Sequence, residues 1–337
     1  MKAARFWSAS FFSLALTVSC APVDDEVDEP APSIAALQVS CSAAQGQRVI
    51  TVAKDGSGQF KSVQAAVNAI ASGNATPVLI HIKPGTYKEQ LTIAGRSKLT
   101  LCGDDAKKTV LTFDTNSSKA GSLDNGASVR VSADDFSAAN ITFENSSPLG
   151  SAQAVALVAS GKRQQFVNCR FLSYQDTLYT KAGTQYFRDS YIQGNVDFVF
   201  GGATAVLQNC ELRTVSKGSA IAAPRTDASL PFGLVFLGGK VTAASGIAAK
   251  SVALARPWGP SGAAAYLNVE LGGHISAAGW TEMSGNSPSN ARFSEYKSTG
   301  PGASPSTRVR GTRQLSDADA KKYTPANVLG WSPSYAR

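Results

Sequence analysis

The chain has 337 residues, of which 43% are hydrophobic and 17% charged, a composition typical of a folded protein with a sizeable core. Lys and Arg outnumber Asp and Glu by 32 to 24, a net charge of +8. Only two histidines occur, His81 and His274, and HExxH, G-x-S-x-G and phosphate-loop motifs are all missing. Zinc, serine-hydrolase and nucleotide-binding chemistries are therefore disfavoured. The basic charge favours an acidic partner, which could be nucleic acid, an anionic membrane or an acidic polysaccharide.

Residues 1–20 have the pattern of a signal peptide, because Lys2 and Arg5 precede an apolar run over residues 6–19. A resident membrane helix needs ~20 apolar residues, so the run is too short to be one. Its end, Ser19-Cys20, resembles a bacterial lipoprotein signal in which Cys20 is acylated, although Thr17 fits that signal poorly. We expect an exported protein, either secreted or anchored by a lipid to the outer membrane of a bacterium. Ordinary cleavage nearby and a mis-started N-terminus are the alternatives.

Residues 21–46 are rich in acid and proline, which predicts a solvated linker. Residues 21–30 hold five acids and no base. Without the first 30 residues the chain has 30 bases and 19 acids, so its body carries about +11. We expect residues 47–337 to form one basic domain on an acidic tether.

Four cysteines remain after Cys20, and if the chain is exported to an oxidising compartment they can form disulfides. They are Cys41, Cys102, Cys169 and Cys210, which allow three pairings. The repeat described next makes Cys169–Cys210 the favoured pair. Two buried free thiols are the alternative.

A pattern [F/L]-x-[N/D]-[S/C] recurs four times, with its Asn/Asp at positions 145, 168, 189 and 209. Each copy lies in a short strand-like run, and strand character continues over residues 233–241 and 265–275. Short strands at this spacing predict a parallel β-helix, an all-β solenoid whose coils stack into one core. Residues 61–71 and a helix start at Ser316 predict short helices that cap the two ends.

The repeat also predicts a column of polar side chains. Eight residues after the first three anchors stand Gln153, Asp176 and Asp197. On neighbouring coils, ~4.8 Å apart, two carboxylates share a proton, so one can serve as an acid and the other as a nucleophile. Gln153 and Gln175 can donate amide N–H groups to a developing oxyanion. Asp and Gln also cap solenoid turns, and that purely structural role is the alternative.

Five segments in order resemble the pectinesterase (pectin methylesterase) family, carbohydrate esterases built on a single-stranded right-handed parallel β-helix. They are Gly85-Thr86-Tyr87-Lys88-Glu89, Gln153-Ala154-Val155-Ala156-Leu157, Gln175-Asp176-Thr177-Leu178-Tyr179, Asp197-Phe198-Val199-Phe200-Gly201 and Leu254-Ala255-Arg256-Pro257-Trp258. The resemblance extends over about residues 48–332. One departure is Ala255, where the family usually has Gly, which matters if that position needs a positive φ.

The resemblance implies hydrolysis of galacturonate methyl esters to pectate and methanol, with no metal and no other cofactor. It implies that Asp197 is the nucleophile, Asp176 the acid and then base, Gln153 and Gln175 the oxyanion donors, and Arg256 the partner of Asp197. Tyr179, Phe198 and Trp258 would form an aromatic floor for sugar rings. We expect a monomer that binds methylated pectin and no nucleic acid, since no basic run is interleaved with aromatic residues. The alternatives are an esterase for another acyl ester or short oligogalacturonides, and a non-catalytic polysaccharide-binding β-helix.

Overall fold

The computed structural model describes residue 1 and residues 40–335. The predicted signal peptide, Cys20 and most of the predicted linker lie outside these residues. Residues 40–335 belong to one compact unit, and the following concerns that unit alone. No helix among the described residues is long and apolar enough to cross a membrane.

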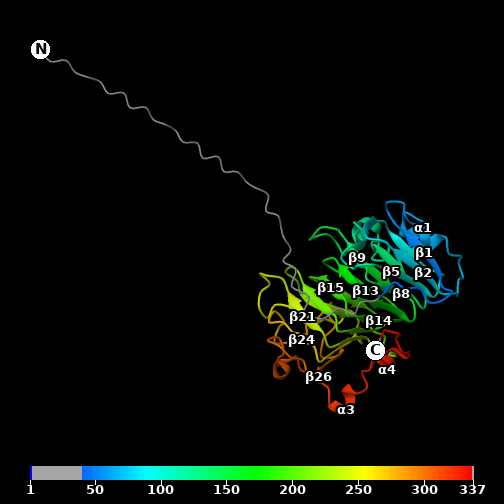
Figure 1. Ribbon diagram of the computed structural model, residues 1–337. Coiled ribbons are helices and arrows are strands. Elements are labelled where there is room, and N and C mark those ends of the chain that lie inside the picture. The colour runs from blue at the N-terminus through cyan, green and yellow to red at the C-terminus, as the bar shows by residue number, and fades with distance from the viewer. Residues whose placement is uncertain (2–39, 336–337) are drawn as a thin grey trace. The chain divides into compact units, whose positions relative to one another are not determined.

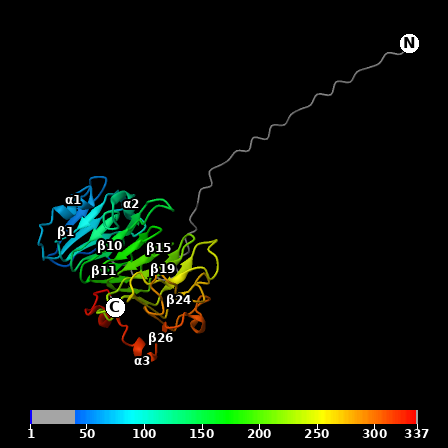
Figure 2. The ribbon, with the colours of Figure 1, turned by 180° about the vertical axis from the view of Figure 1, so that it is seen from behind.

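Three parallel sheets wind into a right-handed β-helix, which confirms the predicted fold class. From β2 to β22 each coil adds one strand to each sheet, while the coils at the two ends add fewer. Figures 1 and 2 follow the coils from the blue N-terminal end at β1 to the orange end near β24. The 11-stranded sheet comprises β1 (Arg48–Val52), β2 (Val78–Ile82), β5 (Leu99–Gly103), β8 (Ser137–Ala139), β11 (Gln164–Val167), β14 (Thr184–Arg188), β17 (Thr204–Gln208), β20 (Leu234–Leu237), β23 (Ala263–Leu267), β25 (Arg292–Tyr296) and β26 (Arg313–Gln314).

The other two sheets complete each coil. The 7-stranded sheet comprises β4 (Leu91–Ile93), β7 (Val129–Val131), β10 (Leu157–Ala159), β13 (Leu178–Thr180), β16 (Val199–Gly201), β19 (Ala220–Pro224) and β22 (Ala253–Ala255). The 8-stranded sheet comprises β3 (Gly85–Lys88), β6 (Thr109–Phe113), β9 (Thr142–Asn145), β12 (Arg170–Leu172), β15 (Tyr191–Gly194), β18 (Glu211–Thr214), β21 (Lys240–Ala243) and β24 (Glu270–Leu271).

Two short helices lie where the sequence predicts them, α1 (Val63–Asn68) beside the first coils and α3 (Asp317–Ala320) after the last strand. The others are α2 (Ser117–Ala120), which lies between β6 and β7, α4 (Pro325–Leu329) and the 3-10 turn Pro305–Thr307. Helix α1 buries Val63 and Val67 beside the first coils, and Ser316 caps α3 through a bond from the Asp319 N–H to its hydroxyl. Helix α4 returns to lie beside β14 and β17 (Figure 1), where it covers the outer face of the 11-stranded sheet.

The repeat arises at the corner that follows each strand of the 11-stranded sheet. Asn168, Asp189 and Asn209 all adopt a left-handed backbone, with φ between 47° and 52°. Asn and Asp tolerate this conformation better than other residues with a side chain, which explains why they recur there. The strand register makes Asn140 (φ 56°) the preceding member, because β8 pairs Ala139 with Val167. The interior behind these corners is apolar, with Phe166 stacked on Phe187 at 4.8 Å between ring centroids.

The expected first copy of the repeat, at Asn145, was therefore wrong. Asn145 ends β9 in the 8-stranded sheet, where Phe143 pairs with Phe171 of β12. The segment at Asn145 matches the sequence pattern, but it lies in the 8-stranded sheet, whereas the other three copies follow strands of the 11-stranded sheet.

The favoured disulfide was also wrong. Cys41 is bonded to Cys102, with 5.6 Å between the Cα atoms, while Cys169 and Cys210 are free and buried. The coil that carries Ser190 lies between the two free cysteines, and the Ser190 hydroxyl accepts from the Cys169 N–H. Two coil spacings amount to roughly 9.6 Å, which exceeds the ~7 Å that a disulfide can bridge between Cα atoms. Burial raises the pKa of both thiols to about 12.

Candidate active site

Asp176 and Asp197 occupy the same position on adjacent coils. Asp176 stands just before β13 and Asp197 just before β16, and the residues that precede them, Gln175 and Val196, form a parallel bridge. Both aspartates adopt left-handed backbones, with φ of 65° and 50°. The Asp176 N–H donates to the Val196 carbonyl at 3.0 Å, which fixes the corner. The predicted stacking of these two residues is confirmed.

Gln153 lies outside that register, and its predicted place in the column was wrong. Strand β10 pairs Leu157 with Leu178, so the residue in register with Asp176 is Val155. The error follows from counting eight residues from Asn145, which belongs to another sheet. The Gln153 Oε1 atom accepts from the Ser117 hydroxyl at 2.6 Å, which orients the amide and leaves its N–H groups for another acceptor.

Gln175 lies on the outer side of the same corner. With Ala154, Tyr174 and Asn195 it lines a small hollow of about 60 Å³. Its backbone carbonyl accepts from the Ala154 N–H at 3.1 Å, which ties the Gln153 and Gln175 segments together. The two glutamines are thus held next to each other by the backbone of successive coils.

Arg256 clamps Asp197 in a bidentate ion pair. Its Nε atom donates to Oδ1 at 2.8 Å and its Nη2 atom to Oδ2 at 2.6 Å. This fork geometry matches both oxygens of a carboxylate and fixes the orientation of Asp197. Ala255, which precedes the arginine, lies in the extended strand β22, so the glycine usual in the family is not required there.

Burial and charge separate the two aspartates. Burial, and after it the charge of Asp197, raises the pKa of Asp176 well above that of an ordinary aspartate, while Arg256 opposes the shift. The bond to Asp197 raises the pKa of Arg256. Asp176 therefore tends to keep its proton, which places a proton donor beside the arginine-bound carboxyl group of Asp197.

An aromatic surface lies three residues beyond the aspartates. Tyr179 and Phe200, paired across β13 and β16, stack at 4.4 Å between ring centroids. Trp258 lies 6.2 Å and 5.9 Å from these two rings. Tyr179 and Trp258 thus lie together beside the aspartates, with Tyr179 9% and Phe200 2% exposed and Trp258 half-buried.

Phe198 does not lie on this surface, and its expected position there needs correction. It is fully buried in the interior core, with 0% of its surface exposed, and Phe200 takes its place beside Tyr179. Asp176 and Asp197 are in register, and so are the third residues after them, Tyr179 and Phe200. Counting along the two coils from the aspartates therefore predicts Phe200 as the partner of Tyr179.

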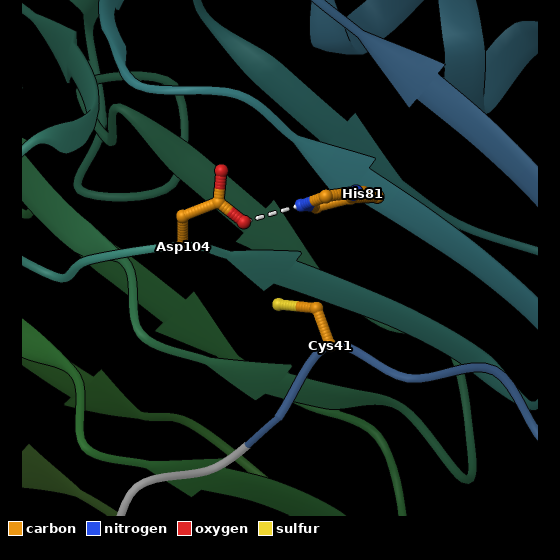
Figure 3. A group of neighbouring side chains, drawn as sticks. All are labelled: Cys41, His81 and Asp104. Atoms are coloured by element: carbon orange, nitrogen blue, oxygen red, sulfur yellow. Dashed lines mark hydrogen bonds and ion pairs between the residues drawn. The ribbon is translucent and has the colours of Figure 1, made fainter.

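The 11-stranded sheet carries a group of possible metal ligands at Cys41, His81 and Asp104, whose ligand atoms lie within 4.8 Å of one another. Figure 3 shows the His81 Nε2 atom directed at Asp104, at 2.5 Å from Oδ1, with the Cys41 sulfur nearby. That sulfur is committed to the disulfide with Cys102, so two ligands remain, which is fewer than a protein zinc site uses.

Comparison with known proteins identifies the family. The pectinesterase family profile matches residues 49–332. The chain belongs to the pectinesterase family. Pectinesterase 31 of Arabidopsis thaliana is 39% identical over 289 residues, which cover 81% of this chain and 89% of the relative.

Solved structures agree with this assignment. The pectin methylesterase from carrot superposes with a TM-score of 0.81 at 31% identity, covering 86% of this chain and 95% of its own. A pectin methylesterase in complex with a hexasaccharide superposes with a TM-score of 0.77 at 33% identity, covering 85% and 98%. This pectinesterase is accordingly an enzyme, a carboxylic ester hydrolase.

Proposed function

We propose that this pectinesterase hydrolyses methyl esters of polygalacturonate to pectate and methanol, with Asp197 as nucleophile and Asp176 as acid and base. One observation carries the proposal: a buried, proton-retaining aspartate lies in register beside an aspartate clamped by Arg256. A metal-free covalent route needs these two groups together. The names of the relatives, and the hexasaccharide bound to one of them, support the substrate class.

In the first half of the reaction the Asp197 carboxylate attacks the ester carbonyl carbon and forms a tetrahedral oxyanion. The C–O bond to the methoxy group then breaks, and Asp176 gives its proton to that oxygen, so methanol leaves. The enzyme retains the sugar as a mixed anhydride of Asp197. The amide N–H groups of Gln153 and Gln175 stabilise the oxyanion.

In the second half, ionised Asp176 removes a proton from water, which attacks the sugar carbonyl of the anhydride. The bond to Asp197 breaks, which regenerates the nucleophile and releases the product carboxylic acid, and this acid loses its proton to solvent. Asp176 is left protonated for the next turnover. Arg256 keeps Asp197 aligned in both halves.

Substrate binding uses the aromatic surface and the basic charge of the domain. Trp258 is half-buried and lies against the largely buried, stacked rings of Tyr179 and Phe200, so its ring is the one best placed to pack on the apolar face of a sugar ring. The net positive charge of the domain attracts the negatively charged polysaccharide, and salt screens this attraction and shortens its range.

We further infer that the protein is exported by residues 1–20, and that Cys20 is acylated so that the acidic linker holds a monomeric domain at a membrane. Intact-mass measurement of the mature protein tests the acylation. A mass that begins at Cys20 with added acyl groups supports the anchor, and an unmodified mature N-terminus contradicts it. The molar mass from light scattering of the same sample tests whether the protein is a monomer.

The activity itself is tested by incubating the purified protein with highly methylated pectin and following methanol and acid together. We expect one acid group per methanol, without added metal and in the presence of a chelator. Release of acetate or another acyl group in place of methanol would contradict the substrate assignment. Binding of pectin without any release would contradict the enzymatic role.

A further inference from the structure

The outer face of the 11-stranded sheet carries a cluster of metal-ligating side chains, while the candidate active site adjoins the 7-stranded sheet. Strand β2 pairs His81 with Cys102 of β5. The alternate residues Ile80 and Leu101 fill the main core, so His81 and Cys102 point away from it. Their side chains therefore stand side by side on the outer face, on adjacent strands.

Two further residues reach the same place. Asp104 follows the end of β5, and its Oδ1 atom lies 2.5 Å from the Nε2 atom of His81. Cys41, on the segment before β1, is bonded to Cys102 and packs in the same outer cluster. The Cys41 sulfur, a ring nitrogen of His81 and a carboxylate oxygen of Asp104 lie within 4.8 Å of one another (Figure 3). Three separate segments of the chain thus bring four ligand side chains together.

This set of ligands suits zinc once the disulfide is reduced. Thiolate, imidazole and carboxylate groups bind Zn²⁺, whereas Ca²⁺ and Mg²⁺ prefer oxygen ligands. Reduction frees two sulfurs, so the cluster then offers four ligands, the number found in a closed tetrahedral zinc site. Ligand atoms in such a site lie roughly 3–4 Å apart, because each bond to the ion measures about 2.0–2.3 Å. The side chains therefore need to shift by only about 1 Å to enclose an ion.

The cluster is accessible from solvent. The side chain of His81 is 20% exposed and that of Asp104 is 40% exposed. The Nζ atom of Lys83 lies 3.8 Å from the other carboxylate oxygen of Asp104, and the lysine side chain is itself 45% exposed. An exposed pair at this distance is weak, so Lys83 can swing away when an ion binds. The ion takes the place of the hydrogen that His81 and Asp104 now share.

We propose that Cys41, Cys102, His81 and Asp104 bind one Zn²⁺ ion when the disulfide is reduced. A dithiol reductant transfers two electrons and two protons to the Cys41–Cys102 bond, which gives two thiols and converts the reductant to a disulfide. Each thiol loses its proton to solvent as its sulfur binds Zn²⁺. A disulfide oxidant reverses the change, because it takes up two electrons, the Cys41–Cys102 bond forms again and the ion is released. The segment before β1 is thus linked to the sheet in either redox state, by a covalent bond or by a metal.

The test uses Co²⁺ as the probe, added to the full-length chain in its oxidised and reduced forms. Every sample carries Cys20→Ser, so that Cys20 contributes no thiol. The reduced form is prepared with a dithiol, which is then removed without oxygen. We expect the reduced protein to bind one Co²⁺ ion, with sulfur-to-cobalt charge-transfer absorption and the intense visible bands of a tetrahedral ion, and Zn²⁺ to displace it. The oxidised protein should show neither absorption.

Variants identify the ligands. His81→Ala and Asp104→Asn should each weaken Co²⁺ binding by the reduced protein at least ~10-fold. Asp114→Asn is the matched control, because Asp114 pairs with Lys88 on another sheet as Asp104 pairs with Lys83, and this variant should bind Co²⁺ as the wild type does.

The buried thiols of Cys169 and Cys210 are controlled by Cys41→Ser/Cys102→Ser, which retains both of them. This double variant should bind no Co²⁺ with sulfur-to-cobalt absorption. Absorption equal to that of the reduced wild type would place the ion on the buried thiols and overturn the inference.

Thermal denaturation gives a second readout that holds even if reduction lowers stability. Zn²⁺ should raise the Tm of the reduced wild type and leave that of reduced His81→Ala unchanged. A reduced wild type with the same Tm and the same absorption with and without metal would overturn the inference, as would wild-type affinity in His81→Ala and Asp104→Asn. None of these measurements uses methanol release, so their outcome is independent of the proposed function.

Discussion

The two catalytic candidates combine a strained backbone with different charge environments. Asp176 and Asp197 both adopt the left-handed conformation, which Asn shares with little added strain and Ala does not. Asparagine is therefore the substitution that removes the charge and preserves the corner. The sequence was enough to predict these residues and Arg256 from their motifs. Gln153 was misplaced because the count began at Asn145, which joins another sheet, whereas the register of Asp176 and Asp197 leads to Phe200 and not to Phe198.

Asp176→Asn should make the protein more stable at neutral pH. The pKa of Asp176 is raised in the folded state, so the unfolded chain loses this proton at a lower pH than the folded one does. The resulting cost to stability is absent below the ordinary aspartate pKa, grows as the pH rises and is complete above the folded-state pKa. We expect a gain of about 1–2 kcal/mol in the free energy of unfolding at pH 7.

Urea denaturation of wild type and Asp176→Asn across a pH series measures this gain. It should shrink toward zero as the pH falls to the ordinary aspartate range. A variant that is less stable than the wild type at pH 7 would contradict the assignment of a strained, buried carboxyl.

At the scale of the elements, one corner conformation determines the repeat. Asn168 holds the left-handed turn after β11, and its Nδ2 atom donates to the Asn140 Oδ1 atom at 2.9 Å. The sequence revealed the period because only a few residue types accept this turn. The mistaken copy at Asn145 and the mistaken Cys169–Cys210 pair have a common reason. A match to the repeat pattern does not determine whether two residues lie one coil apart, two coils apart or on different sheets.

Asn168→Ala should cost about 1–2 kcal/mol of unfolding free energy, because it strains the turn and removes the bond to Asn140. Asn168→Gly removes the same bond without the strain and should cost less. Thermal denaturation of both variants gives the comparison. A glycine variant that is less stable than the alanine variant would show that the left-handed turn does not select the residue.

For the whole molecule, stability depends on covalent and ionic links near both ends of an open solenoid. At the N-terminal side the disulfide between Cys41 and Cys102 closes a separation of 61 residues. At the C-terminal side Arg308 and Glu295, each with 3% of its side chain exposed, form a bidentate pair. Capping helices were predictable from their N-cap residues and periodicity. The ion pair was not, since its partners carry no motif and meet only once the last coils are stacked.

Cys41→Ser/Cys102→Ser should lose about 2–4 kcal/mol of unfolding free energy, because the unfolded chain is no longer cross-linked. Methanol release at moderate temperature should be unchanged, since the disulfide lies on the 11-stranded sheet and the aspartates adjoin the 7-stranded sheet. Peptide mapping of the wild type checks the pairing first. Recovery of a Cys169–Cys210 peptide would contradict it.

Glu295→Gln should lose about 3–5 kcal/mol, because it leaves the Arg308 charge buried without its partner. Asp317→Asn provides the matched control, since its pair with Lys297 is exposed and no measurable change is expected. If urea denaturation gives the same loss of unfolding free energy for both substitutions, the buried pair of Arg308 and Glu295 does not stabilise the C-terminal end.

The central claim is that Asp197 is the nucleophile and Asp176 its acid and base. The most direct measurement is the rate of methanol release from methylated pectin by Asp197→Asn and Asp176→Asn, with Asp135→Asn as a control outside the site. We predict that Asp197→Asn lowers kcat at least ~10³-fold and Asp176→Asn ~10²–10⁴-fold, with native circular dichroism and an unchanged control. A correctly folded Asp197→Asn protein that releases methanol within tenfold of the wild-type rate would contradict the account.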